Sequence, residues 1–330
     1  MRMGAKAASA VLIPWVCLVG SSIAHAQTDA EIYEEIKVIA LHNRASYDRI
    51  RSFSATGTRV YEQYIDPAPL PFNSPVPPGN LVSTCECSWM REGARYRFEQ
   101  RIRREVASAQ YVKESRSIAV LNDGYFANLV DGLPDLIELN THSGIHAMTP
   151  YVKERATNGW EDDPRDYGFN SAFNESLVDY FQAMRANGAR FTLETLEDGD
   201  GRIHKIGYSY PENEGVRGDK GHYLLDPDKD YLITEYRQWN SSGQLRFQMD
   251  VEPQRLDNGA WFPKKCFRKT PEYTAHLNIH EASVNQDIDD RLFGLESFDV
   301  DKSAIRLKQI EADGRTVTWM VLREGQWVRQ

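Results

Sequence analysis

The sequence predicts an α+β protein whose main element is a curved antiparallel sheet, an incomplete β-barrel, that covers a few helices. Three observations predict this fold. Most of the chain after residue 52 alternates apolar and polar residues with period two, turn sequences separate successive runs, and only two segments show a clear helical period. Hairpins that follow one another in this way form a sheet with one buried and one polar face.

The first 26 residues have the pattern of a secretory signal peptide. Arg2 and Lys6 precede an apolar run from Ala7 to Val19, and an Ala-His-Ala exit ends at Ala26. The apolar run is short for a membrane-spanning helix of about 20 residues. We therefore expect cleavage near Ala26 and a periplasmic or secreted protein, residues 27–330, that forms a single domain and does not span a membrane.

The remaining chain is acidic. The formal net charge is −9 for the whole sequence, and loss of the signal peptide removes two positive charges. An acidic surface repels phosphate backbones, so we expect no nucleic-acid partner. The sequence contains neither a Gly-x-Ser-x-Gly nucleophile elbow nor a glycine-rich phosphate loop. These observations favour a protein that is not an enzyme and that needs no cofactor.

The first element after the signal is an amphipathic helix over residues 29–52. Ile32, Ile36 and Ile39 fall on one stripe, and Asp29 is placed to cap the N-terminus. Residues 53–64 change to the period of a half-exposed strand. The segment 66–80 contains six prolines, which exclude a helix or a central strand and predict a long surface loop.

Turn sequences then mark a series of hairpins. The predicted turns lie at residues 92–93, 122–124, 198–201, 241–243, 258–259 and 313–314. A helical insertion around residues 131–188 interrupts the strands. It ends in a helix that buries Leu177, Phe181 and Met184 and stops at Gly188. Hairpins over residues 294–330 close the chain.

The stretch "YLLDPDKDYLITEY" places Asp226, Asp228 and Asp230 at alternate positions, which raises the question of a calcium loop. A helix-loop-helix calcium site needs Gly at its sixth position and Glu at its twelfth. This chain has Tyr231 and Arg237 at those positions. The stretch therefore predicts a turn between two strands.

Two pairs of histidines invite a zinc interpretation. His276 and His280 lie on a predicted strand, where four residues span about 13 Å, too far for one ion. We expect both to face solvent. His142 and His146 would share a helix face, but Gly144 weakens that helix. We predict no metal site.

Three cysteines remain after the signal peptide: Cys85, Cys87 and Cys266. An odd number excludes a fully paired framework within one chain. Cys85 and Cys87 point to the same face of a predicted strand. They are structural thiols, or one of them forms a disulfide with Cys266 in an oxidising compartment.

Aromatic residues are dense on the predicted apolar side of the sheet. The candidates for a ligand cavity are Tyr96, Phe98, Phe247, Met249, Trp261 and Trp319. These residues form either an ordinary core beneath the helices or the lining of a concave face that holds an acyl chain or an apolar peptide. The basic run at 101–106 is the exposed side of a strand or a docking patch for an acidic head group or partner.

The order of these elements resembles the periplasmic outer-membrane lipoprotein-carrier family, which has the LolA-like fold. An exported chain opens with an amphipathic helix, and then come "FSATGTRVYE", "WMREGARYRFE" and an "NDGYFANLV" hairpin. After a mid-chain helix follows "LLDPDKDYLITEYRQWNSSGQLRFQMD" with "DNGAWFPKK". The resemblance covers about residues 29–293. The proline loop, residues 131–176 and the hairpins after Gly294 exceed a minimal carrier of this family.

The resemblance implies a half-barrel with an apolar cavity and no catalytic motif. Two functions follow from it. The first is a cell-envelope carrier or chaperone that binds the acyl chain of a lipid or lipoprotein. The second is an envelope stress sensor or structural protein of the same fold, with a filled core, that acts through protein–protein contacts.

Overall fold

The computed structural model describes residues 28–65, 78–122, 125–130, 136–141, 163–170, 175–199, 201–211, 218–294, 297–298, 306–310, 317–323 and 326–329. Those of them that lie within 125–141 and within 306–327 are described by their backbone alone. The predicted signal peptide, most of the proline-rich loop, His142 and His146 and the turn at 313–314 lie outside these residues.

The strands form one continuous sheet. Their bounds are β1 (Ser52–Ile65), β2 (Gly79–Glu92), β3 (Arg95–Val106), β4 (Tyr111–Asn122), β5 (Tyr125–Val130), β6 (Leu136–Thr141), β7 (Arg190–Asp198), β8 (Gly201–Ser209), β9 (Lys220–Asp226), β10 (Leu232–Trp239), β11 (Leu245–Arg255), β12 (Trp261–Lys269), β13 (Tyr273–Val284), β14 (Arg306–Ile310), β15 (Val317–Arg323) and β16 (Gln326–Arg329).

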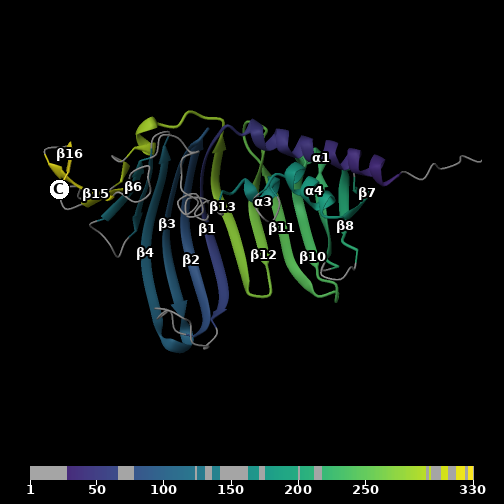
Figure 1. Cartoon of the computed structure of the whole chain (residues 1–330), viewed down its shortest axis with the longest axis horizontal. Coiled ribbons are helices and arrows are strands. Elements are labelled where there is room, and N and C mark those ends of the chain that lie inside the picture. The colour runs from purple at the N-terminus through teal and green to yellow at the C-terminus, as the bar shows by residue number, and fades with distance from the viewer. Residues whose placement is uncertain are drawn as a thin grey trace, which may run out of the picture.

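The described strand order is β16-β15-β14-β6-β5-β4-β3-β2-β1-β13-β12-β11-β10-β9-β8-β7, so the sheet stays open, with β16 and β7 at its two ends. It is curved, and the helices lie against one of its faces (Figure 1). The predicted incomplete barrel that covers helices is confirmed. One pair departs from the antiparallel pattern, because β14 runs parallel to β6.

The strand β6 corrects the predicted helical insertion. Residues 131–188 were expected to interrupt the sheet, but Leu136–Thr141 pairs with β5 on one side and with β14 on the other. A six-residue strand flanked by irregular sequence has too few alternations for its period to show. The later part of the segment contains the expected helix.

Three α-helices are described: α1 (Asp29–Arg49), α3 (Asp166–Phe169) and α4 (Leu177–Ala186). Short 3₁₀ turns are η1 (Ala107–Ala109), η3 (Pro227–Lys229) and η4 (Asp290–Phe293). Helix α4 buries Leu177, Phe181 and Met184 as predicted, and Gly188 follows it with φ of +86°. The predicted cap of α1 is wrong by one residue, because Thr28 and Glu31 form a reciprocal capping box in which Asp29 takes no part.

The predicted turn at 226–231 is confirmed. The Asp226 carboxylate accepts a hydrogen bond from the Asp228 backbone N–H, and η3 links β9 to β10. Asp230 and Tyr231 both have positive φ. Helix α1 docks on this turn: Asn43 Nδ2 donates to the Tyr231 carbonyl at 2.8 Å, and Arg49 pairs with Asp230 at 2.7 Å.

The two faces of the sheet differ. We call the face that carries α1, α3 and α4 the inner face. Helix α3 contacts β10, β11 and β12, and α1 contacts α4 and β7. The opposite, outer face carries paired charges such as Glu194 with Lys205 and Glu252 with Lys265. On β13, Leu277 and Ile279 are buried whereas His276 and His280 are exposed, as predicted.

Candidate functional site

The inner face is apolar over most of its width. The backbone register places Phe98, Trp89 and Ala55 side by side across β3, β2 and β1. A lower row runs through Tyr61, Ala275, Arg268, Met249 and Tyr236 across β1, β13, β12, β11 and β10. Both rows belong to the same face, because residues at even separation along one strand point to one side.

The predicted cavity residues lie in different environments. Tyr96, Phe98 and Met249 are buried in the main hydrophobic cluster, and Phe247 is partly buried against it. Trp261 is partly buried outside that cluster, and the Trp319 side chain is outside the described residues. Because β3 and β11 are five strands apart, about 24 Å, Phe98 and Met249 belong to the same cluster without contacting each other directly.

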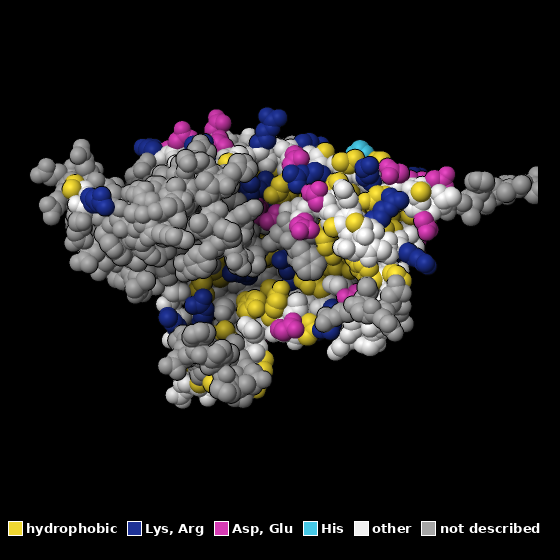
Figure 2. Space-filling model, in the orientation of Figure 1, with side chains coloured by type: hydrophobic (Ala, Val, Ile, Leu, Met, Phe, Trp, Pro, Cys, Tyr) yellow, Lys and Arg dark blue, Asp and Glu magenta, His cyan; other side chains and the backbone are white. Residues whose placement is uncertain are grey.

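The part of the inner face below the helices is only partly covered. Phe247, Tyr61, Tyr273 and Ala275 are all half-buried there. The rings of Tyr61 and Tyr273 stack at 4.9 Å between centroids, and Phe247 lies 5.3 Å from Tyr236. Hydrophobic side chains gather below α3 and α4, next to a hollow (Figure 2). We call these four residues the apolar rim.

Arg268 is a cation in this apolar row. The backbone register places it between Met249 on β11 and Ala275 on β13. Its guanidinium carbon lies 3.9 Å from the centroid of the Tyr167 ring, which comes from α3. Its Nε and Nη2 are buried and have no hydrogen-bond acceptor among the described residues. The pKa of Arg268 is raised even so: burial alone would lower it, but Tyr167 and other nearby acidic groups outweigh that effect.

A buried ionic cluster lies at the N-terminal end of α3. The Arg165 Nε and Nη2 donate to the two oxygens of Asp163, at 3.1 and 2.7 Å, and Arg91 donates to the same carboxylate at 3.2 Å. The pKa of Asp163 is lowered, because these two cations outweigh the effect of its burial. The pKa of Asp166 is raised to about 8, first by burial and then by the charge of Asp163.

The cysteines are buried in the inner face but are too far apart for the predicted bridge. The register aligns Cys85 with Cys266 through one residue on β1 and one on β13. Three strand spacings put their Cα atoms about 14 Å apart, and a disulfide needs less than about 7 Å. The predicted pairing of Cys266 with Cys85 or Cys87 is therefore wrong. Cys85 and Cys87 instead have their sulfurs 3.0 Å apart, and burial raises the pKa of Cys266 to about 12.

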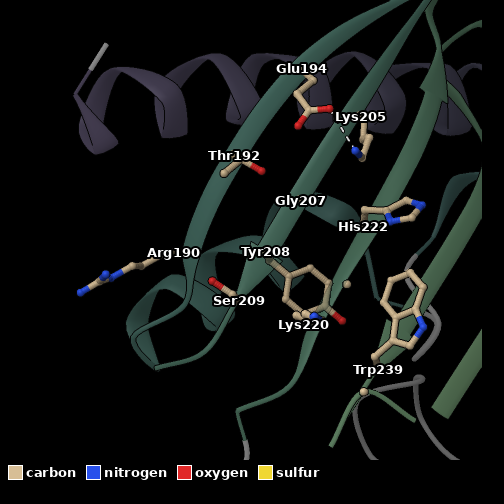
Figure 3. Close-up of a pocket in the computed structure, with 12 residues that line it drawn as sticks. Arg190, Thr192, Glu194, Lys205, Gly207, Tyr208, Ser209, Lys220, His222 and Trp239 are labelled. Carbon is tan, nitrogen blue, oxygen red and sulfur yellow. Dashed lines mark hydrogen bonds and ion pairs between the residues drawn. The ribbon is translucent and has the colours of Figure 1, made fainter. Parts of the chain in front are cut away.

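An open groove of about 530 Å³ lies on the outer face across β7 to β10 (Figure 3). Gly207 forms its floor between Thr192 and His222 in one row of the sheet. The His222 and Trp239 rings stand 5.5 Å apart, and His222 Nε2 lies 2.7 Å from a Glu235 oxygen. This polar surface suits neither an acyl chain nor any other long apolar ligand.

A second groove, of about 580 Å³, follows the basic run on β2 to β4. Arg101 and Arg103 are exposed, and Arg103 pairs with Glu105 and Glu114. The interpretation of this run as the exposed side of a strand is confirmed.

Sequence reasoning missed Arg268 and the ionic cluster. Arg268 was hidden inside "KKCFRK", which reads as an exposed basic run. The signal was present, because Cys266 is apolar and period two places Arg268 on the same buried face. The ionic cluster had no such signal, since Arg91 and Asp163 meet only through the fold.

Neither a protein-family model nor a curated protein matches this sequence. No described helix has the length and apolar character needed to cross a membrane. Among solved structures, this chain is similar to a DUF1329 family protein from Desulfovibrio piger, at 9% identity over 81% of this chain and 98% of that one, with a TM-score of 0.40.

Two further solved structures have a comparable sequence identity, coverage and TM-score. A putative outer membrane lipoprotein-sorting protein domain from Vibrio parahaemolyticus has 9% identity over 78% of this chain and 95% of its own, with a TM-score of 0.34. A LolA superfamily protein from Nitrosomonas europaea has 10% identity over 78% of this chain and 99% of its own, with a TM-score of 0.35.

Proposed function

We propose that this protein is a cell-envelope binding protein, not an enzyme, that holds an acyl chain of a lipid or lipoprotein against the inner face of its sheet. The observation that carries the proposal is the apolar rim: Phe247, Tyr61, Tyr273 and Ala275 continue the buried rows of the core but remain half-exposed. Apolar side chains that remain half-exposed beside a core are typical of a binding site.

The site that we propose runs from the rim toward Met249 and the other buried residues of the lower row. An acyl chain has no hydrogen-bonding groups, so it needs only apolar contact, at about 0.8 kcal/mol per buried CH₂. Aromatic rings at the rim provide large contact areas at little cost in side-chain entropy. The export expected from the first 26 residues would place the protein where lipids and lipoproteins cross the envelope.

The test is a titration of the purified full chain with a fluorescent fatty-acid analogue, together with native mass spectrometry for co-purified lipid. We expect binding, and about tenfold weaker binding for Phe247→Gln, because a partly buried aromatic contact contributes about 1.5 kcal/mol. Val112→Gln is the matched control: Val112 is 54% exposed on β4, outside the inner face, and its replacement should leave the affinity unchanged.

The absence of co-purified lipid together with the absence of binding to any added lipid would refute this function. That result would favour the second candidate, a regulatory or structural envelope protein that acts through its surface. The outer groove with His222 and Trp239 is the observation that favours this candidate. Cross-linking in cells, with Trp239→Ala as the variant, would then identify the partner.

A further inference from the structure

We propose that Arg268 binds the anionic head, a carboxylate or a phosphate, of the ligand whose hydrocarbon part lies on the inner face. This inference rests on the proposed function and adds to it the chemical class of the ligand. It starts from the two buried nitrogens, Nε and Nη2, that have no acceptor among the described residues. A buried donor without an acceptor costs about 1–3 kcal/mol, and more when the group is charged.

The two nitrogens are the pair that recognises a planar anion. Nε–H and Nη2–H point in parallel from one edge of the guanidinium and can donate to both oxygens of one carboxylate or phosphate. The same protein provides the example: Arg165 uses its Nε and Nη2 to hold the two oxygens of Asp163. In Arg268 the equivalent edge is buried and has no hydrogen-bond acceptor within the part of the chain that the structure describes.

The surroundings of Arg268 favour an anion. Among the groups that raise the pKa of Arg268, the carboxyl is that of Asp166, whose own pKa of about 8 leaves it mostly protonated at neutral pH. The other buried carboxylate of the cluster at α3, Asp163, is already held by Arg165 and Arg91. The described residues around Arg268 therefore leave an excess of positive charge in an environment of low dielectric, where an added anion is attracted strongly.

The position of Arg268 also fits an amphiphile. Its neighbours in the row are Met249 and Ala275, and the apolar rim residues Phe247 and Tyr273 lie two positions further along the same two strands. The Tyr167 ring covers the guanidinium from the helix side. A head group bound to Nε and Nη2 would leave its hydrocarbon chain in contact with the rim.

The experiment compares palmitic acid, methyl palmitate and lysophosphatidic acid on the full chain, for the wild type, Arg268→Met and Arg291→Met. The methyl ester has the same chain without the charge. Arg291 is 80% exposed in its side chain and lies outside the inner face, so its variant controls for the loss of one positive charge. Arg268→Met keeps the apolar stem and most of the volume, and it should not lower the melting temperature, because it removes a buried charge whose Nε and Nη2 have no hydrogen-bond acceptor among the described residues.

We expect the wild type to bind at least one of the two anions at least tenfold more tightly than the ester, and Arg268→Met to lose that preference while its affinity for the ester is unchanged. Stronger binding of palmitic acid would identify a carboxylate ligand, and stronger binding of lysophosphatidic acid a phosphate ligand. Equal binding of acid and ester, or an equal loss in Arg291→Met, would overturn the role of Arg268 and leave the proposed function intact. If none of the three ligands binds, the role of Arg268 fails, and the proposed function fails with it when the purified protein also carries no lipid.

Discussion

At the scale of single residues, Asp163 and Asp166 show how position within one cluster decides the charge of a carboxyl. The two lie three residues apart and are both buried, yet the pKa of Asp163 is lowered and that of Asp166 is raised to about 8. Asp163 faces Arg165 and Arg91. Asp166 receives hydrogen bonds from neutral groups, Asn170 Nδ2 at 2.7 Å and Tyr47 OH at 3.4 Å, and feels the charge of Asp163.

The raised pKa of Asp166 predicts a loss of stability toward alkaline pH. The neutral carboxyl contributes stability that is fully present below about pH 4, the pKa of unfolded Asp, and that is lost as the pH rises through about 8. Ionisation of Asp166 lowers the free energy of unfolding by up to about 1.4 kcal/mol per pH unit in this window. Denaturant unfolding from pH 5 to pH 9 should therefore show a shallower decline for Asp166→Asn than for the wild type.

Asp163→Asn is the matched control for that experiment, and its effect has the opposite sign. The lowered pKa of Asp163 gives stability that is present above about pH 4 and lost as the pH falls below it. The variant leaves Arg165 and Arg91 without their carboxylate and should lose about 3–5 kcal/mol at pH 7. Parallel pH profiles for Asp166→Asn and the wild type would contradict the raised pKa.

At the scale of elements, Asn43 contributes a buried amide to the docking of α1. Asn43 is fully buried, and its Nδ2 donates to the Tyr231 carbonyl in the turn between β9 and β10. Tyr231 has positive φ, so the turn presents this carbonyl to the helix in a conformation that few residues adopt. The ring of His42 stacks on Tyr231 at 4.9 Å and adds apolar contact.

Asn43→Ala should lower the free energy of unfolding by about 1–3 kcal/mol, because a buried carbonyl loses its donor. Arg44→Ala provides the control on the same helix turn. Arg44 pairs with Asp48 at 3.1 Å, but both side chains are largely exposed, and such a pair contributes about 0.3–0.5 kcal/mol. Equal effects of the two substitutions in urea unfolding would show that the Asn43 contact does not hold α1 in place.

The elements also show which parts of the fold were predictable from the sequence. The hairpins at 92–93, 241–243 and 258–259 were predicted because their strands are neighbours in sequence and their turns have a local chemistry. The pairing of β6 with β14 was not predicted, since it joins residues about 170 positions apart and is parallel. The inward direction of Arg268 could have been predicted from its spacing of two from Cys266, whereas its cover by Tyr167 could not, because Tyr167 lies far away in the sequence.

At the scale of the whole molecule, the sheet depends on the pairing of β1 with β13. All of β2 to β6 lie on one side of this pair and all of β7 to β12 on the other, and the two paired strands are more than 200 residues apart. We propose that residues 27–330 behave as one domain because this ladder joins the two parts. The register shifts between Thr56 and Gly57, where β13 carries His280 as the extra residue of a β-bulge that bends β13.

Gly57 allows the close approach at this bulge. A Cβ atom at position 57 would lie 2.5 Å from the Asn278 carbonyl oxygen, which belongs to the backbone of β13 and cannot move without breaking the ladder. At Gly207 the closest obstacle is instead the Thr192 hydroxyl, a side-chain group that can rotate away. The two glycines therefore allow a test of the pairing between β1 and β13 with matched substitutions.

Gly57→Ala should lower the free energy of unfolding by about 1–3 kcal/mol, as expected when a close-packed contact is overfilled. Gly207→Ala should lower it by less. If β1 and β13 join the two parts into one domain, the variant should still unfold in a single transition, with circular dichroism and tryptophan fluorescence giving the same midpoint. Separate midpoints for the two signals in Gly57→Ala would mean that the parts on either side of β1 and β13 fold independently. The rows of the inner face would then not form one binding surface, because they cross from β1 to β13.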